Sequence, residues 1–505
     1  MMASEMASST TPWLTLAIFV PIAWGLLVLA VGRDDRAAMT RHLSLVGAII
    51  SFLVTIPLLT GFDATTANMQ FVEKASWIPA FSVFYYLGID GISIWFVLLT
   101  AFVTVIVVLA SYEVIKSRIA QYMAAFLILS GLMVGVFVAL DGLLFYVFFE
   151  ATLIPMYIII GVWGGPNRVY AAFKFFLFTL MGSLLTLVAF IYLWNVSGGS
   201  FDILTWHTLP LGATPQLLIF LALLAAFAVK VPMWPVHTWL PDAHVEAPTG
   251  GSVVLAAIML KLGAYGFLRL SLPIAPDAST GTMAGVMIFL SLVAVIYIGL
   301  VAIVQDDMKK LVAYSSVAHM GFVTLGFFIF NTAGMEGGIV QMVSHGFVAG
   351  AMFLCIGVLY DRMHTRKIAD YGGVVNTMPK FVTFFVLFTM ANAGLPATSG
   401  FVGEFMVIMG AVQFNFWIGL LAATALILGA SYSLWMVKRV AFGDVANDHV
   451  RELTDLNGRE FLILGLLAIA VLAMGLYPAP FTDAMQVSVS DLIHQVARSK
   501  LPMMP

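Results

Sequence analysis

The sequence predicts an all-α polytopic membrane protein with about 14 transmembrane helices. Of its 505 residues, 61% are hydrophobic and 10% are charged, and the mean hydropathy is +1.02, which excludes an ordinary soluble protein of this length. Apolar runs of about 18 or more residues recur, and each could cross roughly 30 Å of hydrocarbon as a helix. The alternating segments of a transmembrane β-barrel do not occur. The formal net charge of −3 gives no indication of a nucleic-acid partner.

The apolar runs follow one another with short connections. The first is expected to be retained, because the N-terminus lacks the basic stretch and cleavage site of a signal peptide. In the longest polar connection, about residues 61–91, the pieces 71–78 and 81–86 predict a short hairpin. The predicted spans are approximately residues 13–31, 43–60, 92–111, 122–140, 143–162, 171–195, 216–237, 250–271, 283–304, 311–330, 336–360, 381–410, 414–437 and 461–478.

The basic residues predict the orientation. Most of the 23 lysines and arginines fall in connections after odd-numbered spans, whereas the other side carries only Lys74, Arg269, Arg498 and Lys500. The excess of positive charge marks the cytoplasmic side. We therefore expect a multi-pass protein of the bacterial inner (cytoplasmic) membrane, surrounded by lipids, with both termini on the periplasmic side.

Two of the spans contain helix-breaking prolines. In the seventh span Pro232 and Pro235 follow closely on Lys230, and in the twelfth span Pro396 precedes Glu404. Proline removes a backbone donor and displaces the carbonyl four residues back. Freed polar backbone is tolerated at membrane depth only against protein or a wet cavity. We therefore expect both spans to be broken helices.

The two broken spans occupy matching places in the chain. Residues 1–121 hold the first three spans, 122–271 hold spans 4–8, 283–440 hold spans 9–13, and 441–505 hold the last span and a tail. Spans 4–8 and 9–13 each have their broken helix in the fourth place. Because five is odd, the second group would enter the membrane upside down. This layout predicts two inverted five-helix repeats, with the broken helices marking a pathway.

Four charged side chains lie within otherwise apolar spans: Glu150, Lys230, Lys261 and Glu404. A charge at bilayer depth costs about 2.5–3.5 kcal/mol on insertion scales. Such a residue needs a partner, water or a function. We interpret the four as steps on a proton path.

Glu150 and Lys230 are the best candidate pair. An opposite charge within about 4–6 Å favours the ionised form of each group, while burial disfavours it. If the glutamate moved or were neutralised, the lysine could release its proton. The alternative is a static salt bridge, which often adds little net stability. Pro155 should loosen the helix that carries Glu150.

The other two charged groups each allow a structural reading as well. Lys261 has no carboxylate partner on its own helix, so it would face an internal water chain and relay protons. The alternative is a lysine that reaches a lipid headgroup. Glu404 is the last ionisable group of the membrane interior in sequence order, and we assign it the outward end of the path. Its alternative role is helix packing.

Two histidines, His319 and His345, fall inside the tenth and eleventh spans. Imidazole titrates near neutral pH and can pass a proton between its nitrogens. A relay, a hydrogen-bonded packing role and ligation of haem remain open for them.

A further group of potential ligands follows the seventh span. His237, Asp242, His244 and Glu246 could bind a metal, but their spacing matches no familiar zinc site and the prolines favour a rigid loop. The single Cys355 excludes internal disulfides and a cysteine-ligated iron–sulfur cluster within this chain.

The run Lys-Val-Pro-Met-Trp-Pro-Val-His-Thr-Trp-Leu-Pro-Asp-Ala-His-Val-Glu-Ala-Pro at 230–248 resembles the antiporter-like subunits of proton-pumping NADH:quinone oxidoreductase, respiratory complex I. Multisubunit cation/proton antiporters and some membrane-bound hydrogenases share this motif. The resemblance extends from about residue 85 to 480. Gly-Leu-Pro-Ala-Thr-Ser-Gly-Phe-Val-Gly-Glu at 394–404 is similar to the M-type subunit, the counterpart of mitochondrial subunit 4, since the L- and N-types typically have lysine in place of Glu404. Arg362-Met-His-Thr-Arg and Asp370-Tyr-Gly-Gly are also M-like.

The resemblance implies a role for each candidate. Glu150 and Lys230 would be the coupling pair, Lys261 and His319 the central relay, and Glu404 the exit-side site, while His345 matches a further family histidine. The chain would be a subunit of an H⁺-translocating NADH:ubiquinone oxidoreductase and would hold no cofactor itself. FMN, the iron–sulfur clusters and the quinone site would belong to partner subunits. The expected neighbours are the L- and N-type subunits.

Three other functions remain to be weighed. The chain could belong to a sodium/proton antiporter or a membrane-bound hydrogenase, which share the motif. It could be a scaffold whose interior charges serve only packing, or a membrane haem protein. Neighbouring genes, mutants of Lys230 and Glu404, and a visible absorption spectrum would separate these classes.

Overall fold

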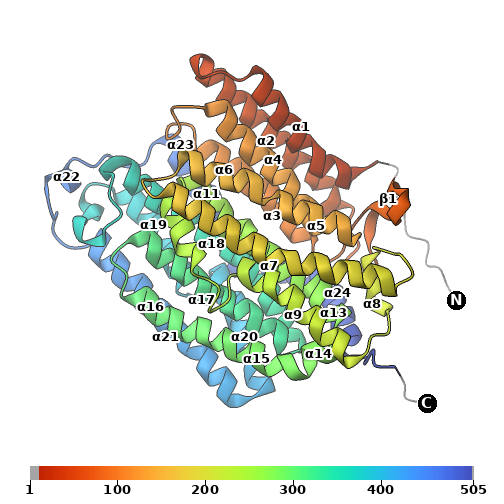
Figure 1. The fold of residues 1–505 in the computed structure, drawn as a ribbon. Helices are drawn as coiled ribbons and strands as arrows, with labels where there is room; N and C mark the ends of the chain where they lie inside the picture. The colour runs from red at the N-terminus through yellow and green to blue at the C-terminus, as the bar shows by residue number, and fades with distance from the viewer. Residues whose placement is uncertain (1–10, 503–505) are drawn as a thin grey trace.

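The structure is a computed structural model that describes residues 11–502. Its helices lie side by side in one bundle, with β1, α8 and α24 at one end and α22 at the other (Figure 1). In chain order the main elements are α1 (Trp13–Val31), α2 (Ala37–Thr60), β1 (Gln70–Ile78), β2 (Val83–Ile89), α3 (Ile94–Ala110), α4 (Ile119–Val138), α5 (Gly142–Ala151), α6 (Leu153–Trp163), α7 (Arg168–Val196), α8 (Ile203–Thr208), α9 (Ala213–Lys230) and α10 (Trp239–Glu246).

The second half of the chain continues the bundle. A continuous helix spans 249–274 and consists of α11 (Thr249–Val254), the π-helical turn η3 (Leu255–Met259), α12 (Leu260–Gly266), a second π-helical turn η4 (Phe267–Ser271) and α13 (Leu272–Ile274). It is followed by α14 (Pro276–Thr280), α15 (Thr282–Val293), the π-helical η5 (Ala294–Ile298), α16 (Gly299–Ile303), α17 (Met308–Phe328), α18 (Thr332–Met363), α19 (Pro379–Asn392), α20 (Ser399–Phe414), α21 (Phe416–Ala441), α22 (Asp448–Arg451), α23 (Gly458–Leu476) and α24 (Ala479–Ala497).

The all-α membrane class is confirmed. Within residues 11–502, 12 helices are long and apolar enough to cross a membrane, and Ile94–Ala110 and Ser399–Phe414 are shorter apolar helices. The count of 14 spans and the inverted relation of the two five-helix groups stay predictions.

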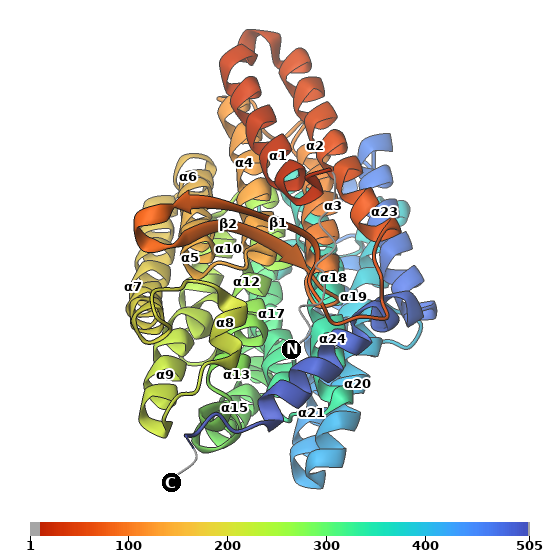
Figure 2. The same cartoon turned by 90° about the vertical axis from the view of Figure 1, so that its right-hand side faces the viewer.

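The predicted hairpin is present. Strands β1 and β2 pair antiparallel, with Ala75 opposite Tyr85. The hairpin and α24 lie across one end of the bundle, which we call the hairpin end (Figure 2). The hairpin also holds the first helix, because the Glu73 carboxylate accepts a 2.8 Å hydrogen bond from the Leu14 backbone N–H at the start of α1. Helix α1 thus begins at the hairpin end with a satisfied backbone donor.

Both expected breaks occur in the helices that carry the prolines. Helix α9 ends at Lys230 and α10 begins at Trp239, while α19 ends at Asn392 and α20 begins at Ser399. The seventh apolar run reaches residue 237, and its helix stops at Lys230, as expected, because Pro232 and Pro235 lack backbone donors.

The helices differ in burial. The helix at 249–274 and α18 are buried over their whole apolar windows, and α17 nearly so, whereas α1, α2, α7 and α21 each leave most of their length at the surface. A central row of buried helices therefore lies inside a ring of peripheral ones. Lys261 lies on this central row, and the helices that carry Lys230 and Glu404 pack against it.

Candidate functional site

Lys230 ends α9 at the first helix break and lies in apolar surroundings. Its residue exposure is 1%, and its Nζ has no hydrogen-bond partner in the described part of the chain. Two aromatic rings lie beside this ammonium: Nζ is 5.0 Å from the Phe149 ring centroid and 5.8 Å from that of Phe175. A desolvated cation–π contact contributes about 2 kcal/mol, which is less than the cost of burying an ammonium without a charged or hydrogen-bonded partner. The charge on Lys230 is therefore poorly compensated.

Glu150 follows Phe149 and approaches Lys230 without touching it. The structure forms no salt bridge between these two described residues, which disfavours the alternative of a static salt bridge. The Glu150 side chain is half-buried, and its Oε1 has no hydrogen-bond partner within residues 11–502. The backbone of Thr152, between α5 and α6, stays helical (φ −62°, ψ −24°), and the loosening by Pro155 stays a prediction. The two charges face each other through space rather than through a hydrogen bond.

Lys261 lies at the centre of the bundle and has two close partners. Its exposure is 0%. Its Nζ donates to the Ala256 carbonyl at 2.5 Å and lies 2.7 Å from Nδ1 of His345. The π-helical turn helps to free that carbonyl, because the Leu260 N–H donates to Leu255 five residues back. Lys261 therefore faces another helix of the protein and not a lipid headgroup.

The two histidines lie next to one another. The ring centroids of His319 on α17 and His345 on α18 are 5.7 Å apart. Nε2 of His345 is buried and has no partner among residues 11–502, although Nδ1 contacts Lys261. One nitrogen of His345 thus meets the central lysine, and the other is free to meet a proton donor or acceptor. His345 connects Lys261 with His319, a position that the sequence did not assign.

His319 connects in turn to Glu404 at the second helix break. Its Nε2 lies 3.1 Å from Oε1 of Glu404 and 3.1 Å from the Asn392 carbonyl. Two acceptors at one nitrogen require that Nε2 carries a hydrogen. The Asn392 carbonyl is the one that Pro396 was expected to displace. The broken helix therefore supplies a polar backbone group to the site.

The surroundings of Glu404 are polar. Its residue exposure is 4%, and Nε2 of Gln341 on α18 lies 3.4 Å from its Oε1. The Asn392 amide donates to the hydroxyls of Ser315 and Ser433 at 3.1 Å each. The sequence alone indicated no role for Gln341, Asn392 or these serines. Only the break at Pro396 pointed toward Asn392.

The four potential metal ligands after α9 are not gathered into one site. Asp242 pairs with Lys174 at 2.6 Å, and the Glu246 carboxylate accepts from the Asn167 N–H at 2.9 Å. His244 stacks on Phe353 with ring centroids 4.4 Å apart. Across residues 11–502, no group of three or more histidine, cysteine or acidic side chains has a metal-binding arrangement.

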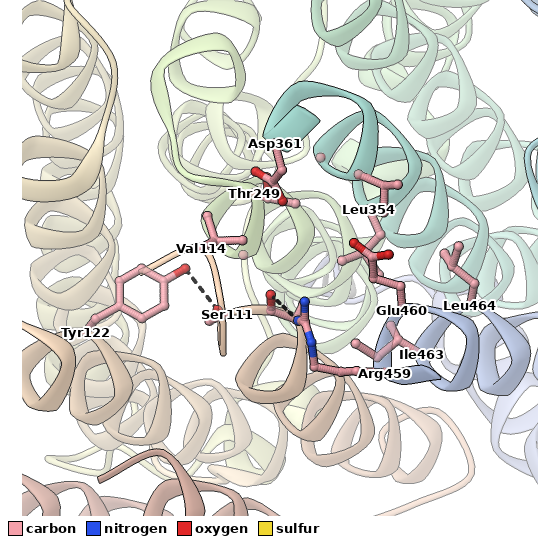
Figure 3. A pocket seen from close by; sticks show the side chains of 14 residues that line it. Ser111, Val114, Tyr122, Thr249, Leu354, Asp361, Arg459, Glu460, Ile463 and Leu464 are labelled. Carbon is pink, nitrogen blue, oxygen red and sulfur yellow. Dashed lines mark hydrogen bonds between the residues drawn. The ribbon is translucent and has the colours of Figure 1, made fainter. Parts of the chain in front are cut away.

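The end of the bundle opposite the hairpin is hollowed. A cavity of about 360 Å³ is lined by Lys116, Glu246, Lys309, Asp361 and Arg366 among others. An adjoining pocket also reaches Asp361 and lies between α3, α4, α11, α18 and α23, as Figure 3 shows. The larger cavity reaches the C-terminal end of α10, where Val245 and Glu246 line it.

Comparisons with known proteins place the chain in a family. Residues 139–429 match the family model described as "NADH:quinone oxidoreductase/Mrp antiporter, TM", and residues 37–139 match "NADH-ubiquinone oxidoreductase chain 4, amino terminus". The NADH-quinone oxidoreductase subunit M of Rhodobacter capsulatus is 50% identical over 497 residues, which cover 95% of this chain and 96% of that protein. The chain belongs to the NADH-quinone oxidoreductase subunit M/chain 4 family.

Other members and structures agree with this family. NADH-ubiquinone oxidoreductase chain 4 of Marchantia polymorpha is 47% identical, with 94% of this chain and 96% of that protein covered. A chain of respiratory complex I from Thermus thermophilus with bound NADH superposes with a TM-score of 0.88 at 31% identity, covering 96% and 100% of the two chains. A chain of the Mrp complex from Dietzia has a TM-score of 0.81 at 21% identity over 96% of this chain and 55% of that one, and shares the fold.

The match to the NADH:quinone oxidoreductase/Mrp antiporter model covers the whole candidate site. All six candidate residues, from Glu150 to Glu404, fall within the 139–429 match. Like its relatives, the chain is a multi-span membrane subunit of NADH-quinone oxidoreductase.

Proposed function

We propose that this chain translocates protons in the membrane arm of NADH-quinone oxidoreductase through Glu150, Lys230, Lys261, His345, His319 and Glu404. The observation that carries the proposal is the buried run of contacts from Lys261 through His345 and His319 to Glu404. Buried ionisable groups in a membrane bundle mark ion pathways. Here four of them form one row between two broken helices.

The proposed route begins at the end opposite the hairpin. The polar cavity there supports proton uptake from the cytoplasm toward Lys230. Lys230 has no partner of its own, so the nearby Glu150 sets how readily it holds a proton. The proton then passes by way of water to Lys261.

The second part of the route uses side chains in contact. Lys261 hands its proton to Nδ1 of His345, 2.7 Å away. The imidazole passes charge on from its other nitrogen, and a water bridges the gap to His319. Glu404, next to His319, releases the proton toward the hairpin end. The crossing from Lys261 to His345 joins the proposed repeats 122–271 and 283–440.

The rest of the enzyme supplies the energy. NADH oxidation by FMN and iron–sulfur clusters, and reduction of quinone, would take place in partner subunits, with no cofactor in this chain. The L- and N-type subunits would flank it in the bacterial inner membrane, with both termini periplasmic. Moving one charge against 100 mV costs about 2.3 kcal/mol. Quinone reduction in a distant partner subunit would supply this energy.

A sodium/proton antiporter subunit is the second candidate. The shared fold of the Mrp chain favours it, but the identity and coverage of the subunit M relatives are much higher. Glu404 also favours the M-type, in which the exit-side residue is acidic rather than a lysine.

The proposal is tested by NADH-driven proton pumping in membranes that carry Lys230→Ala. We expect NADH-dependent acidification to fall on the order of 100-fold for the protons that use this residue, with assembly checked on native gels. Lys310→Ala is the matched control, because Lys310 lies near the surface at the start of α17. Unchanged pumping in an assembled Lys230→Ala complex would leave only a structural role for this lysine.

A further inference from the structure

A second polar stripe leaves Lys261 in the direction of the hairpin end. Tyr265 and Arg269 follow Lys261 at intervals of four residues on the buried helix 249–274, so the three side chains lie near one face. Tyr265 is 0% exposed and Arg269 is 5% exposed. The stripe ends in a cavity of about 190 Å³ that Asp90 and Arg269 line together. If this stripe conducted protons, a proton on Lys261 would have a short path outward that bypasses the second half of the molecule.

The contacts along this stripe run in the wrong direction for proton release. Nε of Arg269 donates to the Tyr265 hydroxyl at 2.9 Å, and that hydroxyl donates to the Phe137 carbonyl at 2.8 Å. A proton wire needs members that accept from one neighbour and donate to the next. This one begins at a guanidinium, which does not lose its proton in proteins, and ends on a backbone carbonyl. It offers no site to which Lys261 could hand a proton.

The guanidinium is itself firmly held. Nη2 of Arg269 lies 2.7 Å from Oδ1 of Asp90, and the same carboxylate oxygen accepts from the backbone N–H groups of Ile92 and Ser93 at 3.0 and 3.1 Å. Both members of the ion pair are more than nine-tenths buried. A buried pair with its remaining lone pairs satisfied keeps a fixed geometry. The positive charge thus stays between the cavity and Lys261.

The residues that line the outer cavity offer few ionisable groups that could take the place of the Arg269 guanidinium. His207 lies outside the spans and contacts the Arg269 carbonyl through Nε2 at 2.8 Å. Burial lowers the pKa of this imidazole to about 3, so the ring is neutral near pH 7. The remaining acidic group at the wall, Asp491, lies on α24 at the surface side of the cavity.

We infer that the buried pair of Asp90 and Arg269 forms a proton seal, which closes the hairpin end of the first half and directs protons from Lys261 to His345, while the Tyr265 hydroxyl beside it conducts no protons. The inference rests on the proposed proton route. A fixed arginine that excludes protons is a known device of selective channels. Arg269 acts here as a positioning residue for the proton path and does not carry the proton.

The seal is tested by passive proton leak in liposomes that contain the assembled complex. A potassium gradient with valinomycin sets the membrane potential, and a trapped pH dye reports proton flux without NADH. Arg269→Lys keeps the positive charge but introduces a group that can release its proton. We expect its leak to rise about tenfold or more above that of the unmodified complex.

Two further variants make the result specific. Arg459→Lys is the control, since Arg459 lies at the opposite end and bonds the Leu109 and Ala110 carbonyls; its leak should stay at the unmodified level. Adding Lys261→Met to Arg269→Lys should remove the extra leak, because the leak would run through Lys261. An assembled Arg269→Lys complex with the leak of the unmodified complex would overturn the seal. The proposed route is tested separately: it would still stand if Lys261→Met alone abolished NADH-driven pumping.

Tyr265→Phe tests the same idea if Arg269→Lys does not assemble. The substitution removes only the hydroxyl, so the seal account predicts an unchanged ratio of protons pumped to NADH oxidised. If Tyr265 were instead a step of an outlet, the ratio would fall, and the seal would be contradicted.

Discussion

The two broken helices hold opposite charges in opposite surroundings. At the α9–α10 break, Lys230 faces aromatic rings and its ammonium lacks a hydrogen-bond partner in the described chain. At the α19–α20 break, Glu404 is bonded to His319 and Gln341. An uncompensated buried charge responds strongly to any charge that moves nearby, while a hydrogen-bonded one is held in place. The first break is therefore suited to gating and the second to holding and releasing a proton.

Lys261 is the residue on which the comparison depends most, because it joins the two regions. Replacing it with methionine keeps the length of the side chain and removes the donor to His345. We expect NADH-driven pumping through this subunit to fall on the order of 100-fold, with NADH oxidation by the detached hydrophilic arm unaffected. Proton uptake by inverted vesicles measures this loss of pumping. Lys438→Met, at the end of α21, serves as the control, and pumping at the unmodified rate in both variants would remove Lys261 from the route.

Lys230→Arg separates a relay from a static charge. Arginine keeps the positive charge near Glu150 but does not release its proton. We expect a loss of pumping of about tenfold or more, close to that of Lys230→Ala. A structural salt bridge would instead tolerate arginine and fail only with alanine. The ratio of protons pumped to NADH oxidised, measured in both variants, distinguishes the two.

His319 and Glu404 should behave as one unit, because Nε2 and Oε1 are 3.1 Å apart. His319→Gln and Glu404→Gln each remove a titrating group, and their effects on pumping should not multiply in the double variant. A double-mutant cycle on initial pumping rates gives the coupling. Independent effects would show that the two groups serve separate functions.

Much of this arrangement was readable from the sequence. The prolines predicted both breaks, and the structure ends α9 at Lys230 and α19 at Asn392, within a few residues of Pro232 and Pro396. Proline acts locally, through its missing donor and its clash with the preceding turn. Local causes of this kind can be recognised from the sequence alone, as could the hairpin in the connection 61–91.

The contacts between helices could not be predicted in the same way. Lys261 and His345 are 84 residues apart, and hydropathy does not specify which faces of two apolar helices meet. The π-helical turn at Leu255–Met259, which helps to free the Ala256 carbonyl, has no proline to announce it. The coupling of Glu150 with Lys230 stays a prediction, because sequence position does not specify how far apart two side chains on different helices lie.

Asn392 should matter for stability more than for proton transfer. Its amide bonds the hydroxyls of Ser315 and Ser433 at 3% exposure of the residue. Asn392→Ala leaves these hydroxyls without that donor, at a cost of about 1–3 kcal/mol. This cost is measured by thermal unfolding of the purified complex, with the loss of this subunit from the complex as the readout. An unchanged midpoint would mean that the second break is not held by this network.

The smallest expected effect lies at the hairpin end. Glu73→Gln keeps the size of the side chain that accepts from the Leu14 N–H but removes the negative charge near the start of α1. The loss should be about 0.3–1 kcal/mol, seen as faster proteolysis of the first helix with pumping unchanged. A loss of pumping would link the hairpin to the proton route.

The most direct measurement is the proton-to-electron ratio of a complex that carries both Lys230→Arg and Glu404→Gln. If a single route joins the two broken helices, blocking it twice does no more than blocking it once, so the double variant should match the more severe single variant. A ratio that falls further, by the product of the two separate losses, would mean that these charges serve unconnected paths and would contradict the account.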